Sequence, residues 1–161
     1  MPTDTTAQNE VIIACNPNAI PAERRERWLE IATHLYTAVQ EIQELPDGYA
    51  FRLPSSSEML LLVAEDLNYE RLCCPFIRFT LDIEPNEGPY WLRFTGAAGV
   101  KEFLRMSFET SNLLNEQVAQ AVGFGIAART DINSVETALE MVSLVNEAFA
   151  KTAGVRTQTE N

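Results

Sequence analysis

Two stretches of the chain repeat one pattern of strand, turn, strand and helix. Residues Tyr49–Pro54 align with Tyr90–Thr95 at an offset of 41 residues. Upstream, Glu41–Ile42 aligns with Asp82–Ile83 at the same offset. Two ββα units in succession predict an α+β fold: a four-stranded antiparallel sheet with helices on one face, in a permuted ferredoxin-like arrangement. Because the similarity is short, both a true duplication and a coincidence of hairpin patterning explain it.

Helical patterns flank this repeat on both sides. The first predicted helix runs from about Pro21 to Ala38 and precedes the sheet. From about Glu109 onward only helical spacing is found, which predicts a C-terminal helical pair whose last member reaches about Lys151. We therefore expect a disordered leader, an α+β domain, a C-terminal helical extension and a loose tail, at residues 1–10, 11–108, 109–153 and 154–161.

The 161-residue chain has a formal net charge of -11, from 23 acidic and 12 basic residues. This charge disfavours a general binder of nucleic acids or anionic membranes. The sequence shows neither a signal-peptide pattern nor an apolar run of the roughly 18 residues that span a bilayer, so we expect a cytoplasmic protein with no nucleic-acid or membrane partner. The broad apolar face of the last helix predicts a homodimer through the C-terminal helices.

The residues richest in chemistry lie where a helix stops at Pro75. Cys73 and Cys74 are adjacent there, and Glu70 precedes them by one helical turn. The spacing predicts an apolar stripe on this helix at Leu60, Val63, Leu67 and Cys74. Three cysteines are an odd number, and chain neighbours lie about 3.8 Å apart at Cα, below the roughly 4.4 Å of ordinary disulfides. We therefore expect no structural disulfide framework.

The thiols allow two interpretations. Cysteine is among the most often buried residue types, so Cys15, Cys73 and Cys74 suit plain packing. Alternatively, the three thiolates converge on a soft or borderline metal ion such as zinc, with Glu70 as a further ligand or proton acceptor. The second interpretation requires that the short N-terminal run carrying Cys15 packs beside the helix that ends at the adjacent cysteines. His34, the only histidine, lies off the apolar stripe of its helix, which favours a solvated position.

A second candidate site lies on the sheet face that points away from the predicted core. Alternation along the strands sends three arginines and a tryptophan to this face, Arg52, Arg78, Trp91 and Arg93. Arginine binds carboxylates and stacks on rings, so the face suits an anionic or planar ligand. The alternative is that the C-terminal helices or a partner subunit cover it. The sequence contains no Gly-rich phosphate loop, HExxH motif or Ser-His-Asp set.

Two motifs resemble a family of small uncharacterised bacterial proteins. The first is E-R-x-C-C-P-F-x-x-F at Glu70–Phe79, and the second is T-G-x-x-G-x-K-x-F-L at Thr95–Leu104. Family members also tend to carry a cysteine before an Arg/Glu-rich helix, as at Cys15, and a turn like that at Leu45–Tyr49. The resemblance implies a bacterial protein and an association with heavy-metal resistance, but no known reaction. The helices after Glu109 depart from the shorter family members.

The leading functional prediction is a non-catalytic protein that binds a soft metal ion, or senses thiol chemistry, through its vicinal cysteines. The alternative is a small-ligand or protein-interaction module that uses the arginine-bearing sheet face. A third hypothesis is an enzyme with a reactive Cys73 or Cys74. With a single histidine, the usual acid–base catalytic sets are hard to assemble.

Overall fold

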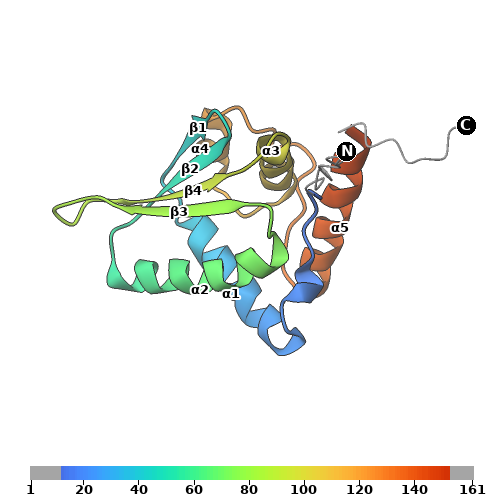
Figure 1. Cartoon of the computed structure of the whole chain (residues 1–161), viewed down its shortest axis with the longest axis horizontal. Helices are drawn as coiled ribbons and strands as arrows, with labels where there is room; N and C mark the ends of the chain where they lie inside the picture. The colour runs from blue at the N-terminus through green and yellow to red at the C-terminus, as the bar shows by residue number, and fades with distance from the viewer. Residues whose placement is uncertain (1–11, 153–161) are drawn as a thin grey trace, which may run out of the picture.

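The computed structural model describes residues 12–152, in which four strands and five α-helices form an α+β fold (Figure 1). The leader predicted at residues 1–10 and the tail predicted at 154–161 lie outside the described residues.

The four strands form one antiparallel sheet in the order β1-β2-β4-β3. These strands are β1 (Glu41–Leu45), β2 (Gly48–Leu53), β3 (Arg78–Ile83) and β4 (Tyr90–Thr95). Both predicted hairpins are present, and they join through their second strands at the centre of the sheet. The predicted α+β fold with a four-stranded antiparallel sheet is confirmed.

The two hairpins carry equivalent ion pairs. A nitrogen of Arg52 lies 3.6 Å from a carboxylate oxygen of Glu41, and a nitrogen of Arg93 lies 2.8 Å from one of Asp82. Each member of the second pair follows its counterpart by the offset of the sequence repeat. Glu41 lies directly opposite Arg52, whereas Asp82 lies opposite Trp91, so the second hairpin has a shifted register. The ion pairs therefore join residues that correspond in the repeat, but the cross-strand register differs, and the duplication stays a prediction.

One helix precedes the sheet, one follows each hairpin, and two more follow these. The helices are α1 (Arg25–Thr37), α2 (Ser57–Cys73), α3 (Val100–Thr110), α4 (Glu116–Ala121) and α5 (Val135–Thr152). The helix predicted from about Pro21 starts with a short 3-10 turn at Ala22–Arg24, because Pro21 itself is extended, with φ -51° and ψ 136°. The α-helix proper begins at Arg25.

An aromatic core joins the helices to one face of the sheet. Tyr36 of α1, Phe51 of β2, Phe94 of β4 and Phe108 of α3 contact one another with ring centroids 5.0 to 6.4 Å apart. Most of these pairs meet edge to face, which suits the charge distribution of the rings. Burial of this apolar surface is the main force that holds the helices on the sheet.

The α2 helix turns to the core a face that only partly coincides with the predicted stripe, of which Val63 and Cys74 are buried. Its buried residues are Met59, Val63, Asp66, Tyr69 and Cys73. The expected stripe members Leu60 and Leu67 are only partly buried. Leucines occupy several sides of this helix, so apolar spacing alone does not define its inner face. As a result, a carboxyl group and a thiol point into the protein.

The α5 helix packs along α3 and α1 instead of on the sheet (Figure 1). Phe149 of α5 meets Phe103 of α3 with ring centroids 5.4 Å apart. The idea that the C-terminal helices cover the arginine-bearing face is therefore wrong. The side chains of Arg52 and Arg93 keep 43% and 48% of their surface exposed.

Candidate thiol site

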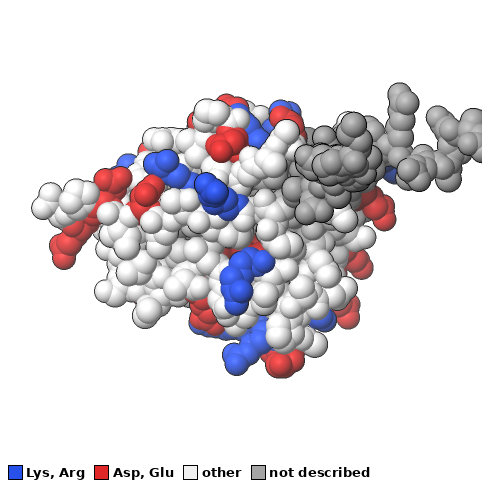
Figure 2. Space-filling view, viewed as in Figure 1, with Lys and Arg blue, Asp and Glu red and all other residues white. Residues whose placement is uncertain are grey.

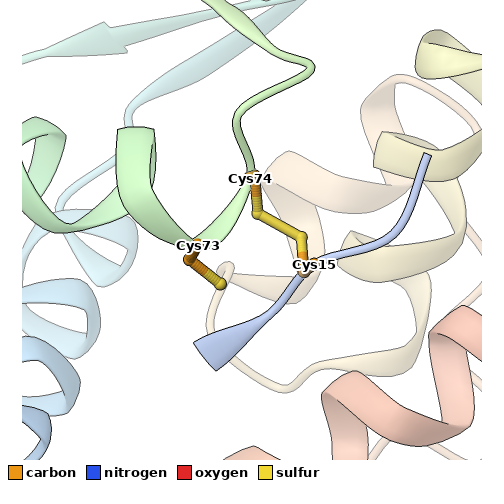
Figure 3. Close-up of side chains that lie close together, drawn as sticks. All are labelled: Cys15, Cys73 and Cys74. Atoms are coloured by element: carbon orange, nitrogen blue, oxygen red, sulfur yellow. A yellow bond between two sulfur atoms is a disulfide. The ribbon is translucent and has the colours of Figure 1, made fainter. Parts of the chain in front are cut away.

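The three cysteines meet where the N-terminal segment passes the end of α2. Their Sγ atoms all lie within 4.8 Å of one another (Figure 3). Cys15 and Cys74 form a disulfide, with Cα atoms 4.7 Å apart. Cys73 is a buried free thiol. The structure thus brings together the three sulfurs that the sequence analysis proposed as one site.

The disulfide corrects the expectation that the chain contains no such bond. The adjacent cysteines are not bonded to each other, but Cys74 is bonded to a cysteine 59 residues away. The short Cα spacing of chain neighbours does keep Cys73 and Cys74 apart, but it does not exclude a bond between one of them and Cys15. A bond between distant cysteines depends on which segments the fold brings together.

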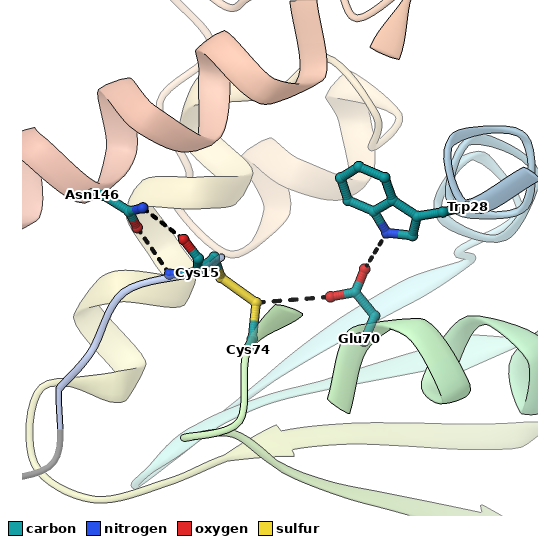
Figure 4. Close-up of a disulfide and its surroundings, with 5 residues drawn as sticks. All are labelled: Cys15, Trp28, Glu70, Cys74 and Asn146. Carbon is teal, nitrogen blue, oxygen red and sulfur yellow. Dashed lines mark hydrogen bonds between the residues drawn. A yellow bond between two sulfur atoms is a disulfide. The ribbon is translucent and has the colours of Figure 1, made fainter. Parts of the chain in front are cut away.

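Hydrogen bonds hold the Cys15 segment between α2 and α5. The backbone N of Asn16 donates to the carbonyl O of Cys73 at 2.8 Å. The backbone N of Cys15 donates to Asn146 Oδ1 at 3.0 Å, and Asn146 Nδ2 donates to the Cys15 carbonyl at 2.8 Å (Figure 4). One amide side chain thereby satisfies both backbone groups of Cys15.

The helix end directs the two adjacent thiols differently. Cys73 is the last residue of α2, and Cys74 caps it with φ -124° and ψ 70°. The Cys74 N still donates to the carbonyl of Glu70 at 2.7 Å, and Pro75 then ends the helix. The side chain of Cys74 therefore points toward Cys15 and bonds to it, whereas the side chain of Cys73 points in another direction (Figure 3).

Glu70 lies between the disulfide and α1. Its Oε1 accepts a hydrogen bond from Trp28 Nε1 at 3.0 Å, and its Oε2 lies 3.9 Å from Cys74 Sγ (Figure 4). Burial of the carboxyl group raises its pKa, and the Trp28 hydrogen bond opposes this rise. A carboxyl group in this position can hold a proton close to the sulfurs.

Further buried ionisable groups continue this cluster along α2. Asp66, one turn before Glu70, is fully buried, and neither of its carboxyl oxygens has a hydrogen-bond partner among the described residues. Burial first, and the nearby Glu70 second, hold its pKa well above the usual value. The same two causes raise the pKa of the Cys73 thiol. Cys73 is therefore a protonated thiol and a poor nucleophile near neutral pH.

A cavity of about 110 Å³ adjoins the sulfurs. The three cysteines line it together with Glu70 and Trp28. Much of the remaining wall is apolar and comes from α3 and α5, including Phe103, Leu104, Phe108, Ala138, Met141 and Val142. The site therefore combines soft sulfur donors, one carboxyl group and an apolar space.

The arginine-bearing face is a separate surface. Arg52 and Trp91 lie opposite each other on β2 and β4, Arg93 follows on β4, and Arg78 is exposed on β3. Two of the three arginines are paired with carboxylates of the same sheet. On the side that Figure 2 shows, basic and acidic side chains are interspersed. Because two of the arginines are paired, this face has less positive charge free for an anionic ligand than its three arginines alone would provide.

Three residues of the thiol site were missed by the sequence analysis: Trp28, Asp66 and Asn146. Asp66 had a usable signal, because it precedes Glu70 by four residues and Cys73 by seven and so shares their helix face. Trp28 and Asn146 come from other helices and have no such signal. His34 is exposed on α1, as expected, and does not join the cysteine cluster.

No family model matches the chain, and neither the curated proteins nor the solved structures contain a match. Within residues 12–152, the helices are all too short or too polar to cross a membrane.

Proposed function

We propose that the reduced protein binds one soft metal ion through the thiolates of Cys15, Cys73 and Cys74. The observation that carries this proposal is the mutual distance of the sulfurs, all within 4.8 Å. A zinc–thiolate bond measures about 2.3 Å, so two sulfurs on one ion lie at most about 4.6 Å apart. Small shifts after reduction bring all three sulfurs to one ion.

The Cys15–Cys74 disulfide is the oxidised, ion-free form in this proposal. A dithiol reductant converts it into two thiols and is itself oxidised to a disulfide. The ion-bound form belongs in a reducing compartment such as the cytoplasm, where thiols are kept reduced.

The donor atoms favour a soft or borderline ion. Thiolates select ions such as zinc, cadmium or mercury over hard ions such as magnesium. Glu70 Oε2 is 3.9 Å from Cys74 Sγ, close enough to act as a fourth ligand or to accept a thiol proton. Because the Cys73 pKa is raised and only thiolates bind, affinity falls as pH falls.

The test is a cadmium titration of the full-length protein after reduction, followed by sulfur-to-cadmium charge-transfer absorption. We expect one ion per chain, and at least a tenfold loss of affinity in each of Cys15→Ser, Cys73→Ser and Cys74→Ser. His34→Ala is the matched control, since this potential ligand is exposed and outside the cluster. The proposal fails if Cys73→Ser binds cadmium as tightly as the wild type, or if oxidised and reduced proteins bind alike.

A thiol sensor is the second candidate, because the free Cys73 thiol lies beside a disulfide, although its raised pKa slows attack on that disulfide. Such a sensor exchanges its disulfide readily, so Cys73 should become trapped in mixed disulfides or be alkylated in the native protein. Mass spectrometry after native alkylation distinguishes the two candidates. Rapid modification of Cys73 favours sensing or catalysis, whereas resistance combined with cadmium binding favours the metal site.

The other predicted roles have less support. An interaction module on the arginine-bearing face has to displace the existing pairs of Arg52 and Arg93. The homodimer through the C-terminal helices stays a prediction, although Val145 and Phe149 of α5 are already buried in the monomer.

A further inference from the structure

The proposed metal site leaves the adjoining cavity without a role. A bare ion held by three thiolates needs no apolar space beside it. Yet all three cysteines line the cavity of about 110 Å³. Two other helices, α3 and α5, also line it, through Phe103, Leu104, Ala138 and Met141. Whatever the sulfurs bind therefore has room for an apolar substituent.

We infer that the ligand is a soft, thiophilic element that carries one short alkyl group. The thiolates hold the soft atom, and the alkyl group enters the cavity. This inference rests on the proposed function, because the same sulfurs bind in both. For an alkylmercury chloride the step is a ligand exchange: a mercury–sulfur bond forms, the mercury–chloride bond breaks, chloride leaves to solvent, and the thiol proton goes to solvent or to Glu70.

The cavity volume limits the alkyl group. An apolar cavity of about 150 Å³ accepts benzene or xenon, so one of about 110 Å³ suits a group smaller than a benzene ring. Each added methylene that enters apolar surroundings strengthens binding by about fourfold. Affinity should therefore rise from methyl to ethyl to propyl and then stop rising, with no further gain for phenyl.

The test compares methyl-, ethyl-, propyl- and phenylmercury chloride on the reduced full-length protein, in competition with a free small thiol. Competition is needed because the protein and the free thiol both form a mercury–sulfur bond. The difference in affinity between them then reports the contribution of the cavity. We expect about a fourfold gain for each step up to propyl. Equal affinities for methyl and propyl would overturn the inference.

Two variants change the cavity in opposite directions. Ala138→Leu adds carbons to a wall residue and should abolish the gain from methyl to propyl. Met141→Ala removes carbons from the same wall and should extend the gain to phenyl. If neither variant changes the chain-length dependence, the alkyl group does not enter this cavity and the inference is wrong.

Cadmium titration of the same variants separates this inference from the proposed function. The cavity variants should keep wild-type cadmium affinity within about twofold, which also shows that the thiol site is folded. Cadmium binding without a chain-length dependence retains the metal site and refutes the alkyl pocket. Chain-length dependence without cadmium binding refutes the three-thiolate ion site and retains the pocket.

Discussion

At the scale of single residues, the buried carboxyl group of Asp66 is the most costly feature of the site. It has zero exposure and no described hydrogen-bond partner, and Glu70 lies one turn away. An ionised carboxylate in such a place is strongly disfavoured, so the group takes up a proton instead. The same buried carboxyl group also contributes to the raised pKa of the Cys73 thiol.

The first prediction concerns Asp66→Asn, which keeps the shape and removes the ionisation. The folded-state pKa of Asp66 is raised above the unfolded value of about 3.9. Its stabilising contribution is therefore full below about pH 3.9 and is lost as the pH rises through the folded-state pKa. We expect Asp66→Asn to increase the free energy of unfolding by about 1–3 kcal/mol at pH 8, because the variant avoids the cost of keeping a buried acid protonated well above its unfolded pKa.

Urea unfolding at several pH values measures this effect. The variant should also show a flatter dependence of stability on pH than the wild type. Glu58→Gln on the exposed side of α2 is the control and should change little. An unchanged pH dependence in Asp66→Asn would show that another group is responsible.

At the scale of elements, two contacts set how the helices and strands lie against one another. In the sheet, Gly48 begins β2 directly against β4, opposite Thr95, and a Cβ at this position would overlap the carbonyl of Phe94. At the site, the side chain of Asn146 ties α5 to the backbone of Cys15. The first contact lets the two hairpins pair at the centre of the sheet, and the second holds Cys15 against α5.

The second prediction is that Gly48→Ala destabilises the protein by about 1–3 kcal/mol, because the added methyl pushes β2 away from β4. Thermal unfolding measures the loss. Gly125→Ala is a matched control, since its Cβ would meet Glu109 Oε2 only at 3.7 Å. Equal stability of the two variants would contradict the crowding at the hairpin junction.

The third prediction is that Asn146→Ala makes the Cys15–Cys74 disulfide easier to reduce. The variant loses both hydrogen bonds that hold Cys15, so the thiols of the reduced protein meet less often. A redox titration with a dithiol buffer should show at least a tenfold lower equilibrium constant for disulfide formation. Glu147→Ala, at an exposed position of the same helix, serves as control. Identical titrations for all three proteins would mean that the side chain of Asn146 has no part in positioning Cys15.

At the scale of the whole molecule, the disulfide connects the N-terminal segment to the end of α2 and closes a long loop. Its two cysteines are 59 residues apart, and the loop between them contains α1, the first hairpin and α2. A covalent link of this kind stabilises mainly by restricting the unfolded chain, and more so for longer loops. Oxidation therefore acts on the stability of a large part of the fold.

The fourth prediction is that reduction lowers the free energy of unfolding by about 4 kcal/mol, from the loop-closure entropy of about 60 residues. Urea unfolding with and without a phosphine reductant measures the difference. Cys73→Ser should show the same difference as the wild type, because Cys73 is free. A loss in wild type below about 1 kcal/mol would mean that the disulfide does not restrict the unfolded chain as expected.

The fifth prediction is the homodimer, which sedimentation at micromolar concentration decides. A dimer has to use apolar surface that the monomer leaves open, such as Leu144 on α5, whose exposure is 56%. Leu144→Glu should then shift the equilibrium to monomer. A wild-type monomer at all concentrations would end this prediction.

The sequence by itself determined the sheet, its hairpins and the helices that follow them, because these depend on local patterns. Alternation in Tyr49–Leu53 and Tyr90–Thr95, and the stop at Pro75, depend only on nearby residues. Only the tertiary structure decided the inner face of α2, the place of α5, the Cys15–Cys74 bond and the contacts of Trp28 and Asn146. These features join residues far apart in the chain, and which of them meet depends on the packing of the whole core.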